Sequence, residues 1–186
     1  MGLFHKFIFL LLPLLLAGCA GLSGDIEEGL PKLRDKLPET TKVYLACPLK
    51  PNGGRLYSRN GQLVVDEFKA AFTARGISVK VDDRRSGGTT DVLDAAVANG
   101  CDLVVFSQVL SWQYGEAGFS GFGGRDEVLL SVMLMRPDTR RVVTRANLRI
   151  VNGVGRSPVG GNDDPRGSIS PIIFKYVKSL FPEVED

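Results

Sequence analysis

The chain has 186 residues, and its 23 basic and 21 acidic side chains give a formal net charge of +2. This near-neutral balance offers no electrostatic argument for binding nucleic acid or an anionic lipid surface. The one histidine, His5, lies in an N-terminal segment that we expect to be removed. A mature chain without histidine has no Ser-His-Asp or Cys-His catalytic triad and lacks a principal zinc ligand. We therefore predict no metal site and no cofactor.

The N-terminus has the pattern of a secretory signal peptide. Lys6 precedes an apolar run at 7–16, and small residues follow, as in a segment that is exported and cleaved. The run is far shorter than the roughly 20 residues that cross a bilayer as a helix. Its end, Leu16-Ala17-Gly18-Cys19, resembles the lipobox of bacterial lipoproteins, in which the cysteine is acylated and the chain is cleaved before it. The resemblance implies a lipoprotein signal peptide over residues 1–18 and fatty chains such as palmitate on Cys19.

The residues after Cys19 indicate where the protein is sent and how far it reaches. Ala20 and Gly21 follow without an aspartate, which by resemblance to the sorting rule of Gram-negative lipoproteins favours the outer membrane of the cell envelope. The inner membrane stays open as the alternative. The anchored chain would face the periplasm. Residues 19–40 are polar and interrupted by glycine and proline, so we predict a flexible tether before a single domain at 41–186.

The first half of the domain alternates strands and helices. Apolar runs at 42–47, 77–81 and 102–110 predict strands. Helical spacing predicts a helix between each pair of strands, at 62–75 and from Thr89 or Thr90 to Ala98. The inward faces of these helices are expected to hold Val64, Phe68, Ala71 and Phe72, and Val92, Leu93, Ala96 and Val97. This order favours parallel strands joined by right-handed crossovers.

The second half predicts a hairpin and a closing helix. Strand-like runs at 127–136 and 141–151 flank Pro137-Asp138-Thr139-Arg140, which is typical of a turn. Ser170 and Pro171 fit the cap and first position of the last helix. The sequence therefore predicts an α/β two-layer sandwich with a mixed sheet of about five strands and three helices, in the order β-α-β-α-β-β-β-α.

Two cysteines remain besides Cys19. Cys47 ends one predicted strand, and Cys101 comes just before another. If these strands are parallel neighbours, the two side chains lie at opposite ends of the sheet, too far apart for a disulfide. We predict two buried thiols, although an oxidising periplasm leaves a disulfide open.

Short motifs along the domain carry a family resemblance. They are Gly54-Arg-Leu-Tyr57, Gly61, the alanine-rich second helix, Gly100-Cys-Asp-Leu-Val104, Trp112, the strand pair around Asp138-Thr139, and Tyr176-Val-Lys-Ser-Leu-Phe181. In these motifs the chain resembles the DUF4823-like family of uncharacterised bacterial lipoproteins, a domain of unknown function. The glycine-rich stretch 113–125 departs from the family pattern. The resemblance implies an envelope lipoprotein and names no activity.

Residues 111–125 form the most unusual segment, because aromatic side chains alternate there with glycines. Rigid rings with polar neighbours are common in binding surfaces, so a loop here would suit a glycan or a peptide. The alternative is a loop folded over the core with its rings as plugs. The candidate ligand-binding residues are Trp112, Tyr114, Glu116, Phe119 and Arg125.

A second candidate site precedes the second predicted helix. Two guanidiniums, hydroxyl groups and free helix amides could hold a phosphate or a carboxylate there. The alternative is a capped loop with solvated arginines. The candidate anion-binding residues are Arg84, Arg85, Ser86, Thr89 and Thr90.

The sequence favours a non-enzymatic binding or envelope-assembly module, with a lipid anchor at Cys19 and an envelope protein or glycan as its partner. One alternative is a cell-wall hydrolase that uses carboxylates such as Glu116 and Asp126. The other is a structural lipoprotein that oligomerises through a sheet edge.

Overall fold

The computed structural model describes residues 24–25, 36–48, 59–82, 88–113, 126–152 and 166–182. Within them a six-stranded sheet has the order β1-β6-β5-β4-β2-β3. β2 is parallel to β3 and β4, and the other neighbours are antiparallel. The strands are β1 Gly24–Asp25, β2 Lys42–Leu45, β3 Ser78–Val81, β4 Leu103–Gln113, β5 Asp126–Met135 and β6 Val142–Asn152.

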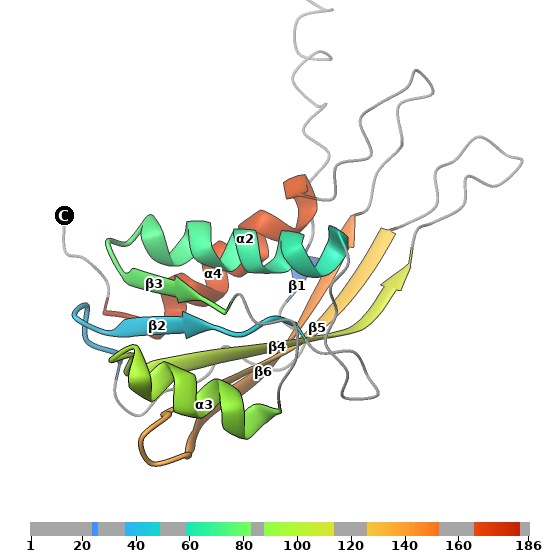
Figure 1. Cartoon of the computed structure of the whole chain (residues 1–186). Helices are drawn as coiled ribbons and strands as arrows, with labels where there is room; N and C mark the ends of the chain where they lie inside the picture. Colours follow the sequence, from blue (N-terminus) through green and yellow to red (C-terminus); the bar gives the residue numbers. More distant parts are fainter. Residues whose placement is uncertain are drawn as a thin grey trace, which may run out of the picture.

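Helices lie on both faces of the sheet (Figure 1). α2, Arg59–Thr73, and α4, Arg166–Leu180, pack side by side on one face, and α3, Thr89–Ala98, lies on the other. The α/β class, the mixed sheet and the predicted order of strands and helices are confirmed. Among the described elements, only α2 and α4 lie over β6 and most of β5, as in the expected two layers, whereas α3 adds a layer under β2, β4 and the end of β5.

The main core lies between the sheet and the pair α2 and α4. The predicted apolar face of α2 is fully buried there, and Phe68 contacts both Phe72 and Tyr176 of α4 through its ring. A smaller core under α3 joins Val92, Leu93 and Ala96 to the sheet. Since apolar burial is the main favourable term in folding, the larger core under two helices provides most of the packing that holds the sheet.

α4 begins earlier than its sequence suggests. Ser170 and Pro171 were expected to start it, yet the helix begins at Arg166 and contains Pro171. A proline inside a helix removes one backbone hydrogen bond. The compensation is Ile169, which is fully buried and extends the apolar stripe of Ile172, Ile173 and Tyr176 by one turn.

The cap of α3 also differs from the prediction. The N-cap is Gly88, not Thr89 or Thr90, and the Asp91 carboxylate accepts the Gly88 N–H at 2.7 Å. Val97, expected inside, is 52% exposed. The helix covers only part of its sheet face, and Val97 lies one residue past the buried Ala96, at the rim of that contact.

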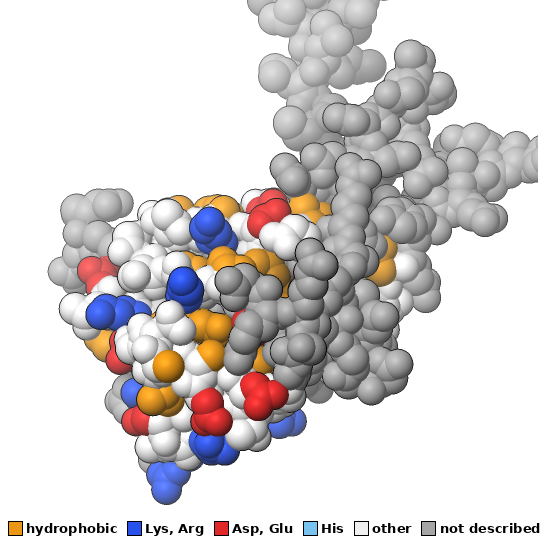
Figure 2. Space-filling view, viewed as in Figure 1, with side chains coloured by type: hydrophobic (Ala, Val, Ile, Leu, Met, Phe, Trp, Pro, Cys, Tyr) orange, Lys and Arg blue, Asp and Glu red, His pale blue; other side chains and the backbone are white. Residues whose placement is uncertain are grey.

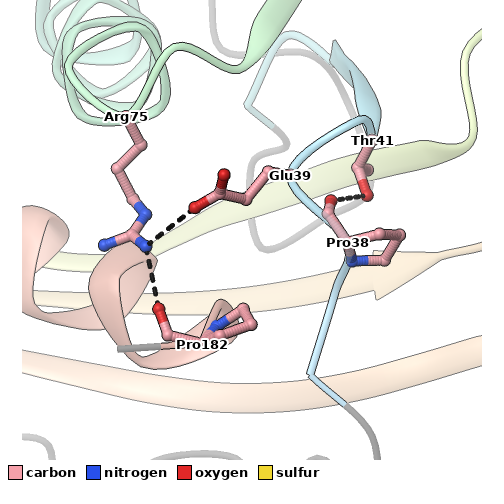
Figure 3. Close-up of polar contacts among 5 residues, drawn as sticks. All are labelled: Pro38, Glu39, Thr41, Arg75 and Pro182. Atoms are coloured by element: carbon pink, nitrogen blue, oxygen red, sulfur yellow. Dashed lines mark hydrogen bonds and ion pairs between the residues drawn. The ribbon is translucent and has the colours of Figure 1, made fainter. Parts of the chain in front are cut away.

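The segment before β2, expected as tether, packs against the domain where it is described. β1 pairs with the end of β6, and the buried Leu37 donates its backbone N–H to the Leu180 carbonyl at 2.9 Å. Figure 3 shows Arg75, just after α2, reaching toward Glu39 and the Pro182 carbonyl. Packing of the folded domain therefore begins before Thr41, and residues 37–39 meet the residues at the end of α4 beside the end of α2.

The prediction of two buried thiols is confirmed, because Cys47 and Cys101 are both free and buried. Val43 of β2 is level with Leu103 of β4, so the two cysteines lie about six residues, roughly 20 Å, apart along the sheet. Burial raises the pKa of the Cys101 thiol, and the neighbouring Asp102 raises it further. A raised pKa leaves little thiolate near neutral pH, so Cys101 is a structural residue with low reactivity.

Candidate functional site

The sheet surface of β4, β5 and β6 opposite α2 and α4 is called the open face below. Residues directly across an antiparallel pair place their side chains on the same face. The register therefore defines rows of side chains that cross three strands. Three rows of the open face are Phe106–Met133–Arg145, Gln108–Ser131–Asn147 and Ser111–Leu129–Arg149. The alternate rows, such as Val109–Leu130–Leu148, are buried in the main core.

A β-bulge in β4 decides which way Trp112 points. Val109 pairs with Leu130 and Ser111 pairs with Leu129, so Leu110 is an extra residue in the strand. Regular alternation would put Trp112 on the same face as Gln108. The bulge moves it to the other face, where it is half-buried and packs against the main core. Leu110 itself is 38% exposed.

The open face contains a hollow of about 170 Å³. Three strands contribute to it, and its lining combines apolar and polar side chains. Phe106 and Met133 also belong to the smaller core under α3, so the hollow borders a packed region of the fold. The lining residues are Phe106, Ser107, Gln108, Ser131, Met133 and Arg145.

Two arginines of the open face have different electrostatic surroundings. Arg149 Nε donates to Glu127 Oε1 at 2.9 Å, so its charge is balanced within the sheet. Arg145, one row away, is exposed and forms no ion pair with a carboxylate among the described residues. The hollow is thus lined by one guanidinium whose charge is not balanced by a described neighbour.

The aromatic segment is only partly described. Trp112 lies in β4 rather than in a loop, because β4 continues three residues beyond its predicted end. Tyr114, Glu116, Phe119 and Arg125 lie outside the described residues. The ligand-binding role of this set therefore stays a prediction, and its described member faces the core.

The predicted anion site is likewise described only at one end. Thr89 and Thr90 are exposed at the start of α3, and Arg84, Arg85 and Ser86 lie outside the described residues. The Asp91 carboxylate already accepts a hydrogen bond at this helix end, and its charge opposes a second anion there. Figure 2 shows acidic side chains over α3 with basic ones beside them, and Asp94 pairs with Arg140 at 2.8 Å.

The described carboxylates bear on metal binding and on the hydrolase alternative. Asp82 is buried and accepts a hydrogen bond from the Tyr44 hydroxyl at 3.1 Å. In the described ranges, no three side chains of the metal-ligating types come together. Glu116 and the side chain of Asp126 lie outside the description, so the hydrolase alternative stays a prediction. Cys19 is also outside it.

The hollow could not be predicted from the sequence. Its residues come from three strands separated by long stretches of chain, so no local motif contains them. One signal was present: in 142–150, arginine and asparagine alternate with apolar residues, which predicts one solvated face. What the alternation could not show is which residues of β4 and β5 lie opposite Arg145.

The fold and the open face define the described part of the protein as a mixed-sheet α/β domain. Solved structures with a similar fold include PelC from Paraburkholderia phytofirmans, described as a dodecamer, with 18% identity and a TM-score of 0.61 over 81% of this chain and 94% of that chain. Lipoprotein GNA1162 from Neisseria meningitidis is 15% identical, with a TM-score of 0.47 over 68% of this chain and 90% of that chain. No family model and no curated protein matches the chain. The likeness to PelC establishes the fold, and the resemblance to the DUF4823-like family stays a prediction.

None of the described helices is long and apolar enough to cross a membrane.

Proposed function

We propose that this chain is a lipid-anchored protein of the bacterial outer membrane whose periplasmic α/β domain is a non-enzymatic binding or assembly module. The lipobox-like Leu16-Ala17-Gly18-Cys19 supports the anchor. The observation that carries the binding role is the open face, where three long strands present polar and apolar side chains and where no described helix lies over β6 or most of β5. Solvated sheet faces with mixed side chains suit recognition of a partner.

The anchor is tested by replacing the acylated atom. In cells fed labelled palmitate, the wild-type chain should incorporate label and fractionate with the outer membrane, and Cys19→Ser should lose both, because the thiol is the site of acylation. Globomycin should make the wild-type precursor accumulate. Cys47→Ser is the matched control and should behave as wild type. Labelling of the Cys19→Ser chain, or fractionation of the unlabelled wild type with soluble proteins, would contradict the proposal.

A second role, assembly into a homo-oligomer, is favoured by one comparison. The similar PelC structure is a dodecamer, and the match covers 94% of that chain. If identical subunits assemble head to tail, each must present two different surfaces that fit each other. Light scattering of a chain expressed from Ala20 onward, which lacks the signal peptide and the acylated cysteine and so avoids detergent, is expected to give a defined mass of several protomers. A monomer at all concentrations would show that the unacylated chain does not assemble. If the acylated chain in detergent is also a monomer, the proposed homo-oligomer is excluded.

A further inference from the structure

We propose that the hollow of the open face binds the C-terminal residue of a peptide, with the peptide carboxylate on Arg145 and the last side chain on Met133. This inference rests on the proposed binding role and names its ligand. All six residues that line the hollow are described.

The charge of the hollow indicates a ligand with a single negative charge. Arg145 is the one cationic residue among the lining residues, and Arg149 nearby is already paired with Glu127. A guanidinium binds a carboxylate through two parallel hydrogen bonds. A phosphate carries more charge and usually meets several cations or a helix N-terminus, and neither lines this hollow. The single guanidinium therefore favours a carboxylate.

The other lining residues suit the peptide group and the side chain of a C-terminal residue. Ser131 lies in the row next to Arg145 and offers a hydroxyl near the position of a ligand peptide group. Met133 is half-buried and offers a flexible apolar surface for the terminal side chain. A sugar acid would need polar partners around its whole ring, whereas Phe106 and Met133 make one side of this hollow apolar.

The volume agrees with one residue. The hollow measures about 170 Å³, which is small. It is well below the roughly 300–1,000 Å³ of sites that enclose a drug-sized ligand. We therefore expect the hollow to hold the last residue only, with weak affinity for a short peptide.

The test is an NMR titration of the full mature chain with acetyl-Ala-Leu bearing a free carboxylate. The expected dissociation constant is roughly 1 mM. The same peptide with an amidated C-terminus should bind about ten-fold more weakly, because it lacks the charge that Arg145 recognises. Equal binding of the amidated peptide, or tighter binding of glucuronate or inorganic phosphate, would overturn the assignment.

The matched variants are Arg145→Met and Arg141→Met. Both remove an exposed arginine of the same region, but only Arg145 lines the hollow. Arg145→Met should weaken binding of the free-acid peptide about ten-fold, and Arg141→Met should leave it unchanged. Should Arg145→Met fold poorly, Ser131→Asp offers a second route, because a carboxylate in the hollow repels the ligand carboxylate. Unchanged affinity in whichever of these variants folds would refute the site.

The experiments distinguish failure of the peptide-binding proposal from failure of the lipid-anchor proposal. Peptide binding in solution does not depend on acylation, so the Cys19→Ser chain should bind the peptide as the wild type does. Palmitate labelling with no peptide binding would support the lipid anchor and contradict the peptide as its ligand. Peptide binding without palmitate labelling would support the peptide site and contradict the lipid anchor.

Discussion

Val132→Asp is expected to prevent folding, or to lower the free energy of unfolding by more than about 4 kcal/mol, because it places a carboxylate in the main core. Val132 is fully buried in the central strand β5, in the row between Ser107 and Ala146. The charge could reach neither water nor a described cation from there. A loss of this size is a large share of the roughly 5–15 kcal/mol that stabilises a typical domain.

The matched control is the same substitution at the preceding residue. Ser131 points to the open face, so Ser131→Asp leaves its charge in water beside Arg145 and should change stability by about 1 kcal/mol or less. Urea unfolding followed by circular dichroism measures both variants. The pair tests the register directly: if Ser131→Asp were the damaging change and Val132→Asp the harmless one, the assignment of faces in β5 would be reversed.

The regular part of this fold could be predicted from the sequence because its signals are local. Apolar runs bounded by glycine and proline marked β2, β3 and β4, and helical spacing marked Phe68 and Phe72 as core residues. Errors arose where a tertiary contact outweighed a local rule. Pro171 looks like the start of a helix, yet burial of Ile169 extends α4 one turn before it. Likewise, Val97 has a core-like pattern but lies beyond the area that α3 covers.

The candidate site was harder to predict, because it depends on which residues lie opposite one another. A change of one residue in register turns every side chain of a strand to the other face. The extra residue Leu110 makes this change within β4, and it places Trp112 against the core although simple alternation predicts the open face. Arg145 could be assigned to a solvated face from the sequence, but its neighbours Gln108 and Met133 follow only from the pairing of three strands.

Phe68→Ala is expected to lower the free energy of unfolding by about 3–5 kcal/mol. The Phe68 ring is buried between α2 and α4, with its centroid 6.5 Å from that of Phe72 and 6.3 Å from that of Tyr176, which it meets edge-on. Removing it leaves a cavity that two helices and a sheet can fill only by moving together, and lost contacts on both helices add to the lost burial.

The measurement is urea unfolding followed by the fluorescence of Trp112, the only tryptophan in the chain. Because Trp112 packs against the same core, its emission reports on the unit that Phe68 stabilises. Lys69→Ala is the control, since Lys69 is exposed on the same turn of α2, and it should change stability by about 0.5 kcal/mol or less. A loss below about 1 kcal/mol for Phe68→Ala would mean that α2 and α4 do not share one core, and that α4 adds little to the stability of the face opposite the hollow.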